Sequence, residues 1–310
     1  MTYGSLLISI AFLLTQCQSP ANTETENPIV YMAKGYEFPY NLREPDQTME
    51  LAPVLNEISG LSMAYRDTRI AAINDELGTI YLLDPQNGKI VQEIPFWKTG
   101  DYEGIEVKGS DAYVVKSSGT IYEVKHFGTE GQEVTKYNTV LGKENDVEGF
   151  CFTPEGDKLL MACKGQAGIK SQNLEVKNIY SFDLETKTVD TIPYIQINRN
   201  QINEFLHQNQ QIPKLEKLIE FFDPSHPSFT LSPSSIAIHP ETGHFYLTSS
   251  VGKVFLVLDG SGNILYIEKL SKKIHPQPEG MCFASDGTLY ISSEGKELGA
   301  GRIQKFVLNR

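Results

Sequence analysis

Glu148-Gly-Phe-Cys-Phe152 is a short motif in which an acid and a glycine precede an apolar strand. Related motifs recur along the whole chain. The other copies are Glu57-Ile-Ser-Gly-Leu61, Glu103-Gly-Ile-Glu106, Glu279-Gly-Met-Cys-Phe283 and Ser234-Ser-Ile-Ala-Ile238, the last of which lacks the acid. They begin at positions 57, 103, 148, 234 and 279, with spacings of 46, 45, 86 and 45 residues. A repeat of this length is typical of a propeller or solenoid with one supersecondary unit per repeat.

Each repeat carries the strands of one propeller blade. The motif is followed by a turn rich in Gly, Asp and Pro, a return strand, a second turn and a third strand. In the first repeat these later strands cover residues 70–74 and 79–84, and a fourth is visible at 90–94. Four short antiparallel strands in a unit of about 45 residues predict an all-β fold, a β-propeller.

The spacing of 86 residues is close to twice the others, so six blades are an alternative to five. Residues 201–222 instead show a helical pattern, with Ile202, Leu206, Leu215 and Leu218 at helical spacing and a break at Pro213. We therefore predict a five-bladed β-propeller with a short helical insertion near residues 201–222. The last repeat ends after its third strand, so we expect the segment around residues 48–51 to supply the outer strand and close the ring.

The composition limits the partners of this protein. The chain has 310 residues, of which 40% are hydrophobic and 21% charged, and its formal net charge is −12. These values are ordinary for a globular protein. The negative charge argues against nucleic acid, whose phosphates need a basic surface, and favours a protein that attracts cations.

The N-terminus resembles an export signal. Residues 6–14 form an uncharged apolar run that is too short to span a bilayer as a helix. It ends in Leu14-Thr-Gln-Cys17, similar to a bacterial lipoprotein signal in which the cysteine receives the lipid. Two features depart from that pattern, since Gln16 replaces the usual small residue and no basic residue precedes Lys34. We predict a signal peptide over 1–17 with Cys17 as the lipidation site, and a plain signal peptide is the alternative.

The rest of the chain divides into two parts. Residues 18–28 read as a flexible polar tether, and residues 29–310 as a single propeller domain. The predicted location is the bacterial cell envelope, either periplasmic or surface-facing, with membrane attachment through the lipid anchor only.

Equivalent positions of a closed ring converge on its axis, so the acids that open four of the repeats are expected to meet around a central channel. The loops after the second strands lie on the same face and add further acids. Like charges held close together do not all stay ionised without a cation between them. Oxygen ligands without a His or Cys cluster favour Ca²⁺. The predicted ligands are Glu57, Glu103, Glu148, Glu279, Asp75 and Glu294; glutamates that only hydrogen-bond within Glu-Gly turns are the alternative.

The cysteines and histidines form no metal-binding motif. Cys151 and Cys282 occupy equivalent positions of different repeats, so we expect reduced core thiols and no disulfide between them. His239 and His244 are expected on the surface of the opposite face. His275 lies four residues before Glu279 and is a candidate general base, with a solvent-facing loop histidine as the alternative.

The order of the motifs resembles the SdiA-regulated (YjiK-like) proteins over residues 36–308. The segments that carry the resemblance are Asn56-Glu-Ile-Ser-Gly-Leu-Ser62, Tyr102-Glu-Gly-Ile-Glu106, Asp146-Val-Glu-Gly-Phe150, Pro233-Ser-Ser-Ile-Ala-Ile-His-Pro240 and Pro278-Glu-Gly-Met281. The resemblance implies a five-bladed propeller, a Ca²⁺ site and attachment to the envelope, and it implies little about activity. It extends more distantly to NHL-repeat propellers, calcium-dependent lactonases and esterase-like phytases. In the lactonases a Glu-Gly-Pro opening supplies a metal ligand, whereas Ile, Phe or Met follows the glycine here.

Two functions follow from these expectations. The first is a non-catalytic, lipid-anchored, calcium-binding propeller that presents its acidic face to an envelope protein or a small molecule. The second is a calcium-dependent hydrolase of a lactone, ester or phosphoester, in which the ion polarises an oxygen and activates water. The absence of a Gly-x-Ser-x-Gly motif from the sequence favours the first.

Overall fold

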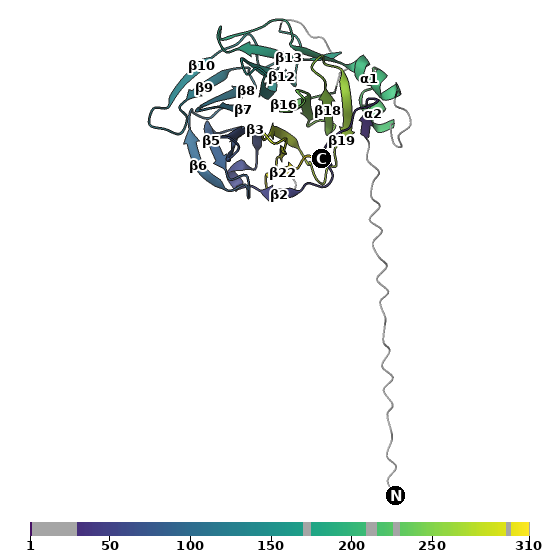
Figure 1. Ribbon diagram of the computed structural model, residues 1–310, viewed down its shortest axis with the longest axis horizontal. Helices are drawn as coiled ribbons and strands as arrows, with labels where there is room; N and C mark the ends of the chain where they lie inside the picture. Colours follow the sequence, from purple (N-terminus) through teal and green to yellow (C-terminus); the bar gives the residue numbers. More distant parts are fainter. Residues whose placement is uncertain (2–29, 170–174, 209–215, 226–229, 296–298, 310) are drawn as a thin grey trace.

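Five small antiparallel sheets are arranged as the blades of a ring in the computed structural model (Figure 1). The structure describes Met1 and residues 30–169, 175–208, 216–225, 230–295 and 299–309. The predicted signal peptide, Cys17 and the tether lie outside the described residues. Within these ranges, no helix has the length and apolar character needed to cross a membrane. The prediction of an all-β, five-bladed propeller is confirmed, and the six-bladed alternative is not needed.

Each blade begins with its innermost strand and continues outward in chain order. The first contains β3 (Ile58–Ala64), β4 (Arg69–Asn74), β5 (Thr79–Leu83) and β6 (Ile90–Pro95). The second contains β7 (Tyr102–Lys108), β8 (Asp111–Lys116), β9 (Ile121–Lys125) and β10 (Glu133–Tyr137). The third contains β11 (Val147–Phe152), β12 (Lys158–Cys163), β13 (Val176–Asp183) and β14 (Thr188–Val189), and β15 (Ile195–Asn198) also pairs with β13.

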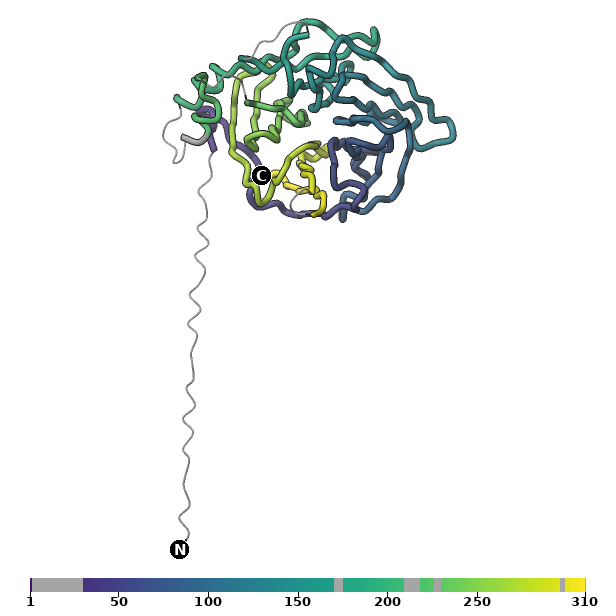
Figure 2. Tube along the Cα trace, turned by 180° about the vertical axis from the view of Figure 1, so that it is seen from behind, coloured from purple at the N-terminus to yellow at the C-terminus, as the bar shows by residue number. Residues whose placement is uncertain are grey.

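The fourth and fifth blades take strands from the N-terminal part of the chain. The fourth contains β16 (Pro233–Ile238), β17 (Phe245–Ser249), β18 (Val254–Leu258), β19 (Ile264–Lys269) and, outermost, β1 (Val30–Met32). The fifth contains β20 (Pro278–Phe283), β21 (Leu289–Ser293), β22 (Arg302–Phe306) and β2 (Gln47–Glu50). Figure 2 shows the N-terminal segment following the rim of the ring from the fourth blade to the fifth.

The pairing of β2 with β22 closes the ring, as predicted for residues 48–51. Met49 pairs with Ile303, and both side chains are buried between the fifth and first blades. The backbone N–H of Val307 donates to the Asp46 carboxylate at 2.7 Å, which fixes the same junction. A blade built from both chain ends removes the open edge that an incomplete last blade would expose.

The hydrophobic core is divided into one cluster at each junction between adjacent blades. Apolar residues alternate along the strands and fill the space between neighbouring sheets. Between the first and second blades, for example, Ile73 and Ile80 pack with Ile105 and Val114. The largest cluster lies between the third and fourth blades.

Two helices cover the outer side of that largest cluster. The helix α1 (Arg199–Gln208) and the helix α2 (Glu216–Phe221) lie beside β18 and β19, outside the ring (Figure 1). Ile202 and Leu218 are fully buried there. The prediction of a short helical insertion is therefore confirmed. The chain also contains a short 3-10 helix, η1 (Pro53–Leu55), just before the first blade.

Candidate metal centre

The innermost strands carry a bulge at the same place in every blade, and this bulge positions the acids. In each case the pairing with the second strand shifts register near the start of the inner strand. A β-bulge bends the strand and turns a side chain away from its regular direction. The residues at this position are Ser59, Glu103, Glu148, Ser234 and Glu279. We call Glu103, Glu148 and Glu279 the acidic ring.

Glu57 does not occupy this ring position in the first blade. The strand register makes Ser59 the equivalent of Glu103 at the bulge. Ile58 pairs with Asn74 just before the bulge in the first blade, as Tyr102 pairs with Lys116 in the second. Glu57 precedes the strand and is exposed. The expectation that four equivalent glutamates meet on the axis is therefore corrected to three, with serines in the other two blades.

The glycine after the ring position is required by close packing of the inner strands. A Cβ on Gly104 would lie 2.4 Å from the Cβ of Phe150 in the next blade. A Cβ on Gly60 would lie 2.9 Å from the backbone nitrogen of Ile105. Glycine therefore allows four of the five inner strands to approach their neighbours closely, with Ser235 at this place in the fourth blade, and this is a packing reason for the repeated Glu-Gly pair.

The loops after the second strands lie on the acidic face, as expected. Backbone N–H groups of Asp75 and Lys164 donate to the carbonyl groups of Glu57 and Asp146, at 3.3 and 2.8 Å. In the last blade, the N–H of Glu294 donates to the carbonyl of Gln277 at 3.1 Å. The six predicted ligands are thus on one face of the ring, although the Glu57 side chain is exposed.

Burial and mutual repulsion raise the pKa values of the acidic ring. The pKa of Glu103 rises to about 9, chiefly through burial and then through repulsion from Glu148, Asp101 and Glu279. That of Glu148 rises to about 7, because burial outweighs its attraction to Lys164. Burial is also the main reason that the pKa of Glu279 is raised well above its ordinary value, and Glu148 adds to it.

A second acidic group adjoins the ring at the junction of the first and fifth blades. Burial raises the pKa of Asp75 to about 6, with further repulsion from Glu57, Glu294 and Glu76. Glu294 also repels Glu148 and Glu279, so the two groups share one electrostatic field. The predicted residues therefore interact, and their charges destabilise one another.

The Lys164 side chain lies among these acids. The Lys164 ammonium group donates to Glu148 Oε1, and it also attracts Glu279. Burial alone would lower the pKa of Lys164, but attraction to these carboxylates raises it to about 12. Lys177 lies behind it and donates to the Gly165 carbonyl at 2.8 Å. Lys164 therefore neutralises part of the ring.

The donor atoms of this site fit a hard cation in their chemistry. Glu148 is 7% exposed, and its Oε2 has no hydrogen-bond partner among the described residues. The same holds for Asp75 Oδ1 and for the Ser293 hydroxyl on the acidic face. Within the described ranges, however, no three His, Cys, Asp or Glu side chains are already arranged to hold a metal ion. The oxygen donors of these side chains thus suit Ca²⁺, while the described residues contain no preformed set of three metal-binding side chains.

His275 lies in the core and not on the acidic face. Its ring is fully buried, Nε2 is 2.9 Å from the Leu42 carbonyl oxygen, and the ring stacks on Phe306 at 5.8 Å. Burial lowers its pKa to about 4, which keeps the ring neutral. Neither a general base nor a solvent-facing loop histidine describes this position, and His275 acts as a packing residue.

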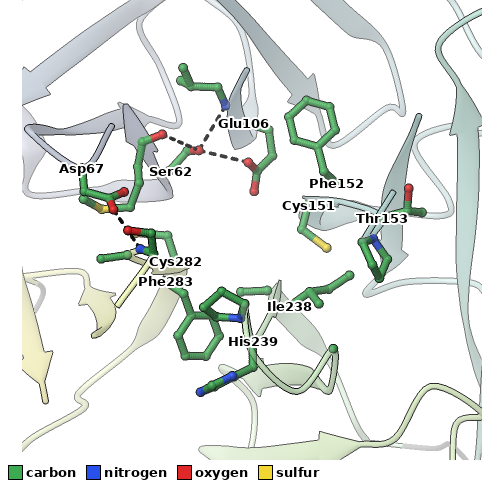
Figure 3. Close-up of a pocket in the computed structure, with 18 residues that line it drawn as sticks. Ser62, Asp67, Glu106, Cys151, Phe152, Thr153, Ile238, His239, Cys282 and Phe283 are labelled. Carbon is green, nitrogen blue, oxygen red and sulfur yellow. Dashed lines mark hydrogen bonds between the residues drawn. The ribbon is translucent and has the colours of Figure 1, made fainter. Parts of the chain in front are cut away.

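The opposite end of the channel contains a cavity of about 400 Å³ that sequence reasoning missed (Figure 3). Ser62, Glu106, Cys151 and Cys282 line it. Cys151 and Cys282 are free thiols, in agreement with the expectation of reduced cysteines. His239 also borders the cavity and is 2% exposed, so its predicted place on the surface is wrong.

The fold and the site define a five-bladed β-propeller with an acidic ring at one end of its channel. The chain belongs to the SdiA-regulated family, whose model matches residues 39–297. This match confirms the resemblance given by the repeated motifs. No curated protein matches the chain.

Several solved structures are similar to this chain at low sequence identity. Glutaminyl cyclase from Myxococcus xanthus is 10% identical with a TM-score of 0.55, covering 86% of this chain and 96% of that one. A gluconolactonase from Xanthomonas campestris is 11% identical with a TM-score of 0.47, covering 81% and 72%. Virginiamycin B lyase from Staphylococcus aureus is 13% identical with a TM-score of 0.43, covering 85% and 74%. At 10% identity, the similarity to glutaminyl cyclase shows a common fold alone.

Proposed function

We propose that this protein is a calcium-binding propeller of the bacterial cell envelope with a binding role at its acidic face. The observation that carries the proposal is Glu148, a buried carboxylate with one oxygen unpartnered among the described residues. It lies beside Glu103 and Glu279, which repel it and each other. Buried carboxylates that repel one another are costly, and a cation on the channel axis would offset that cost for all three groups.

The residues that would hold the ion are the acidic ring, with Asp75 and Glu294 nearby. Carboxylate and hydroxyl oxygens suit Ca²⁺, which accepts six to eight oxygen ligands in a flexible geometry. When bound, the ion supplies positive charge that keeps these carboxyl groups ionised. Lys164 performs part of that role through its bond to Glu148 Oε1. The cation and the Lys164 ammonium group therefore compete for the same carboxylate.

A binding role is better supported than hydrolysis. The candidate general base His275 is fully buried and bonded to the Leu42 carbonyl. Without His275, a hydrolase at the acidic face would depend on the ion and on the carboxylates of the acidic ring to activate water. A binding role needs only an accessible acidic face whose side chains the ion keeps in place. The partner would be an envelope protein or a small molecule.

The proposed location depends on Cys17, which lies outside the described residues. A lipid on this residue would anchor the propeller to a membrane through the tether of residues 18–28. Replacing Cys17 by serine should move the protein from the membrane fraction to the soluble fraction in a bacterial host. Retention of the Cys17→Ser protein in the membrane would contradict lipid anchoring.

Thermal unfolding of the full chain tests calcium binding. The protein is treated with EDTA, and Ca²⁺ or Mg²⁺ is then restored. A cation that binds only the folded state raises the melting temperature. We expect a rise with Ca²⁺ that Glu148→Gln abolishes and that Glu133→Gln preserves, because Glu133 is exposed on the outer strand β10.

If the melting temperature responds neither to EDTA nor to Ca²⁺, the calcium content of the protein is measured before and after EDTA treatment. Calcium retained after EDTA treatment would mean that the ion is held too tightly to remove, in support of the proposal. Protein that contains no calcium and does not respond to its addition would overturn it. The three glutamates would then be structural residues that Lys164 partly neutralises.

A further inference from the structure

The channel end opposite the acidic ring is a second, separate place where the five blades converge. The cavity of about 400 Å³ lies at the C-terminal ends of the inner strands and at the turns that follow them. Glu106 lies three residues after Glu103 on β7, a rise of about 10 Å along a strand. The cavity is therefore distinct from the candidate metal centre.

One position of the inner strands supplies a side chain to this cavity from every blade. The register makes Ser62, Glu106, Cys151, Ala237 and Cys282 equivalent, and all five line the cavity. Four of them are small or weakly polar, and Glu106 alone is charged. Figure 3 shows the Glu106 carboxyl group and the Cys151 thiol directed into the space between the blades.

Glu106 is held in a fixed position by hydrogen bonds. The Ser62 hydroxyl donates to Glu106 Oε2 at 3.0 Å, and the Val107 backbone N–H donates to the Ser62 hydroxyl at 3.1 Å (Figure 3). Burial raises the pKa of Glu106 to about 8, although its hydrogen bonds with Ser62 and Val107 oppose the rise. The carboxyl group is thus oriented by the protein while its charge is disfavoured.

No cation among the described residues forms an ion pair with Glu106. Lys108 ends the same strand, but its ammonium group donates to the Gly156 carbonyl at 2.6 Å and lies 5.7 Å from the centre of the Phe152 ring. A ligand ammonium group would therefore meet a preoriented carboxyl group without an ion-pair partner among the described residues, and the positive charge of the ligand would favour ionisation of that group.

Most of the remaining wall residues are apolar, although Asp67, Thr153 and His239 also line the cavity, and the mouth has room for a longer molecule. Phe152, Ile238 and Phe283 border the cavity, and a second cavity of about 420 Å³ shares Met63 and Val107 with it. Small-molecule sites combine this kind of apolar lining with a few placed polar groups.

The turn at the mouth is strained. Tyr65, Arg66 and Asp67 have φ angles of 50°, 56° and 64°, in the left-handed region that non-glycine residues rarely adopt. Asp67 holds the turn against the fifth blade by accepting from the Ser285 N–H at 2.9 Å. Backbone strain of this kind gathers at binding sites and ligand clamps.

We propose that this cavity binds a small apolar amine, whose ammonium group pairs with Glu106 while its apolar body packs against Phe152 and Phe283. The inference is independent of the calcium proposal, because it uses other side chains at the other end of the channel. Ser62 acts as a positioning residue that orients the carboxylate.

Ligand-observed NMR titrations of the full chain in EDTA test this inference. The probes are 2-phenylethylamine, the neutral analogue 2-phenylethanol and the anionic analogue 3-phenylpropionate. We expect the amine to bind at least about tenfold more tightly than the alcohol, because it forms a charge-assisted hydrogen bond with a desolvated carboxylate. Glu106→Gln should remove this preference, and the exposed control Glu133→Gln should keep it.

The comparison of probes on the unchanged protein is decisive even if a variant fails to fold. Equal affinity for amine and alcohol, or no binding of the amine, would overturn the proposal. A preference for 3-phenylpropionate would also overturn it and would point to Arg66, which lines the adjoining cavity. Insensitivity of amine binding to Glu106→Gln, with a folded variant shown by circular dichroism, would place the amine elsewhere and refute the assignment.

Discussion

Replacing Glu103 by glutamine is expected to stabilise the fold when no divalent cation is present. Burial and the neighbouring carboxylates raise the pKa of Glu103 from 4.5 to about 9. Between these pH values the folded protein retains a proton that the unfolded chain releases. Ionisation of Glu103 therefore lowers the free energy of unfolding as the pH rises through this window.

The size of the effect follows from the pKa shift. Each pH unit inside the window costs up to about 1.4 kcal/mol of stability. At pH 7 the accumulated penalty approaches about 3 kcal/mol, and solvent screening at this partly exposed side chain reduces it. Glutamine keeps the shape and the hydrogen-bonding capacity but cannot ionise, so it escapes the penalty.

Urea unfolding in EDTA at pH 5, 6, 7 and 8 measures this effect. The difference in stability between Glu103→Gln and the unchanged protein should grow with pH, whereas Glu133→Gln should show a flat difference. In saturating Ca²⁺ the order should reverse, because only the unchanged protein keeps its full set of carboxylates for the ion. A Glu103→Gln protein that is equally or less stable than the unchanged protein at every pH in EDTA would refute the reasoning.

Three further changes test other parts of the structure. Lys164→Met should strengthen Ca²⁺ binding by about tenfold, measured by calorimetry, because it removes the ammonium group that competes for Glu148; weaker binding would show that Lys164 supports the site. Gly104→Ala should destabilise the fold by about 1–3 kcal/mol in urea unfolding, since its Cβ would lie 2.4 Å from a side chain, while Gly260→Ala, with nothing within 4 Å, should be nearly neutral. Met49→Ala should cost about 2–5 kcal/mol, because Met49 is 3% exposed in the strand that closes the ring; a smaller loss would mean that closure is dispensable.

The blades could be predicted because each repeat carries its own turn chemistry and its own strands. Residues 70–74 and 79–84 were expected as strands and correspond to β4 and β5. Local alternation and turn residues decide such elements. The strands β1 and β15 were not predicted, because each adds to an edge whose partner is chosen by the folded ring and not by the segment itself.

The acidic ring was predicted in part, and the error has a physical cause. Aligning the repeats on their glutamates placed Glu57 with Glu103, but the bulge makes Ser59 the equivalent residue. The better guide was the following glycine, since Gly60 and Gly104 are held at the axis by close packing. The glycine indicates the strand register more reliably than the glutamate does, because close contact between backbones excludes other residues, whereas a long side chain can be accommodated in several positions.

The cavity that Glu106 lines could not be anticipated from the repeats. Glu106 looked like one more acid in a repeated motif, and only the ring brings it together with the thiols Cys151 and Cys282. His275 and His239 were misplaced for a similar reason. Each is a loop or turn residue by local sequence, yet packing against Phe306 or Phe283 buries its ring.

The closing blade also sets the order in which this protein can finish folding. Asp46 and Val307, which are joined by a hydrogen bond, lie 261 positions apart in the chain. During synthesis, β2 has no partner until the last residues have left the ribosome, and the four blades made before then form an open arc. Contacts of such high sequence separation form late and slowly. Closure of the ring is therefore expected to be the rate-limiting event, and a chain truncated before β22 should remain exposed to aggregation through the apolar faces of the first and fourth blades that the fifth blade covers.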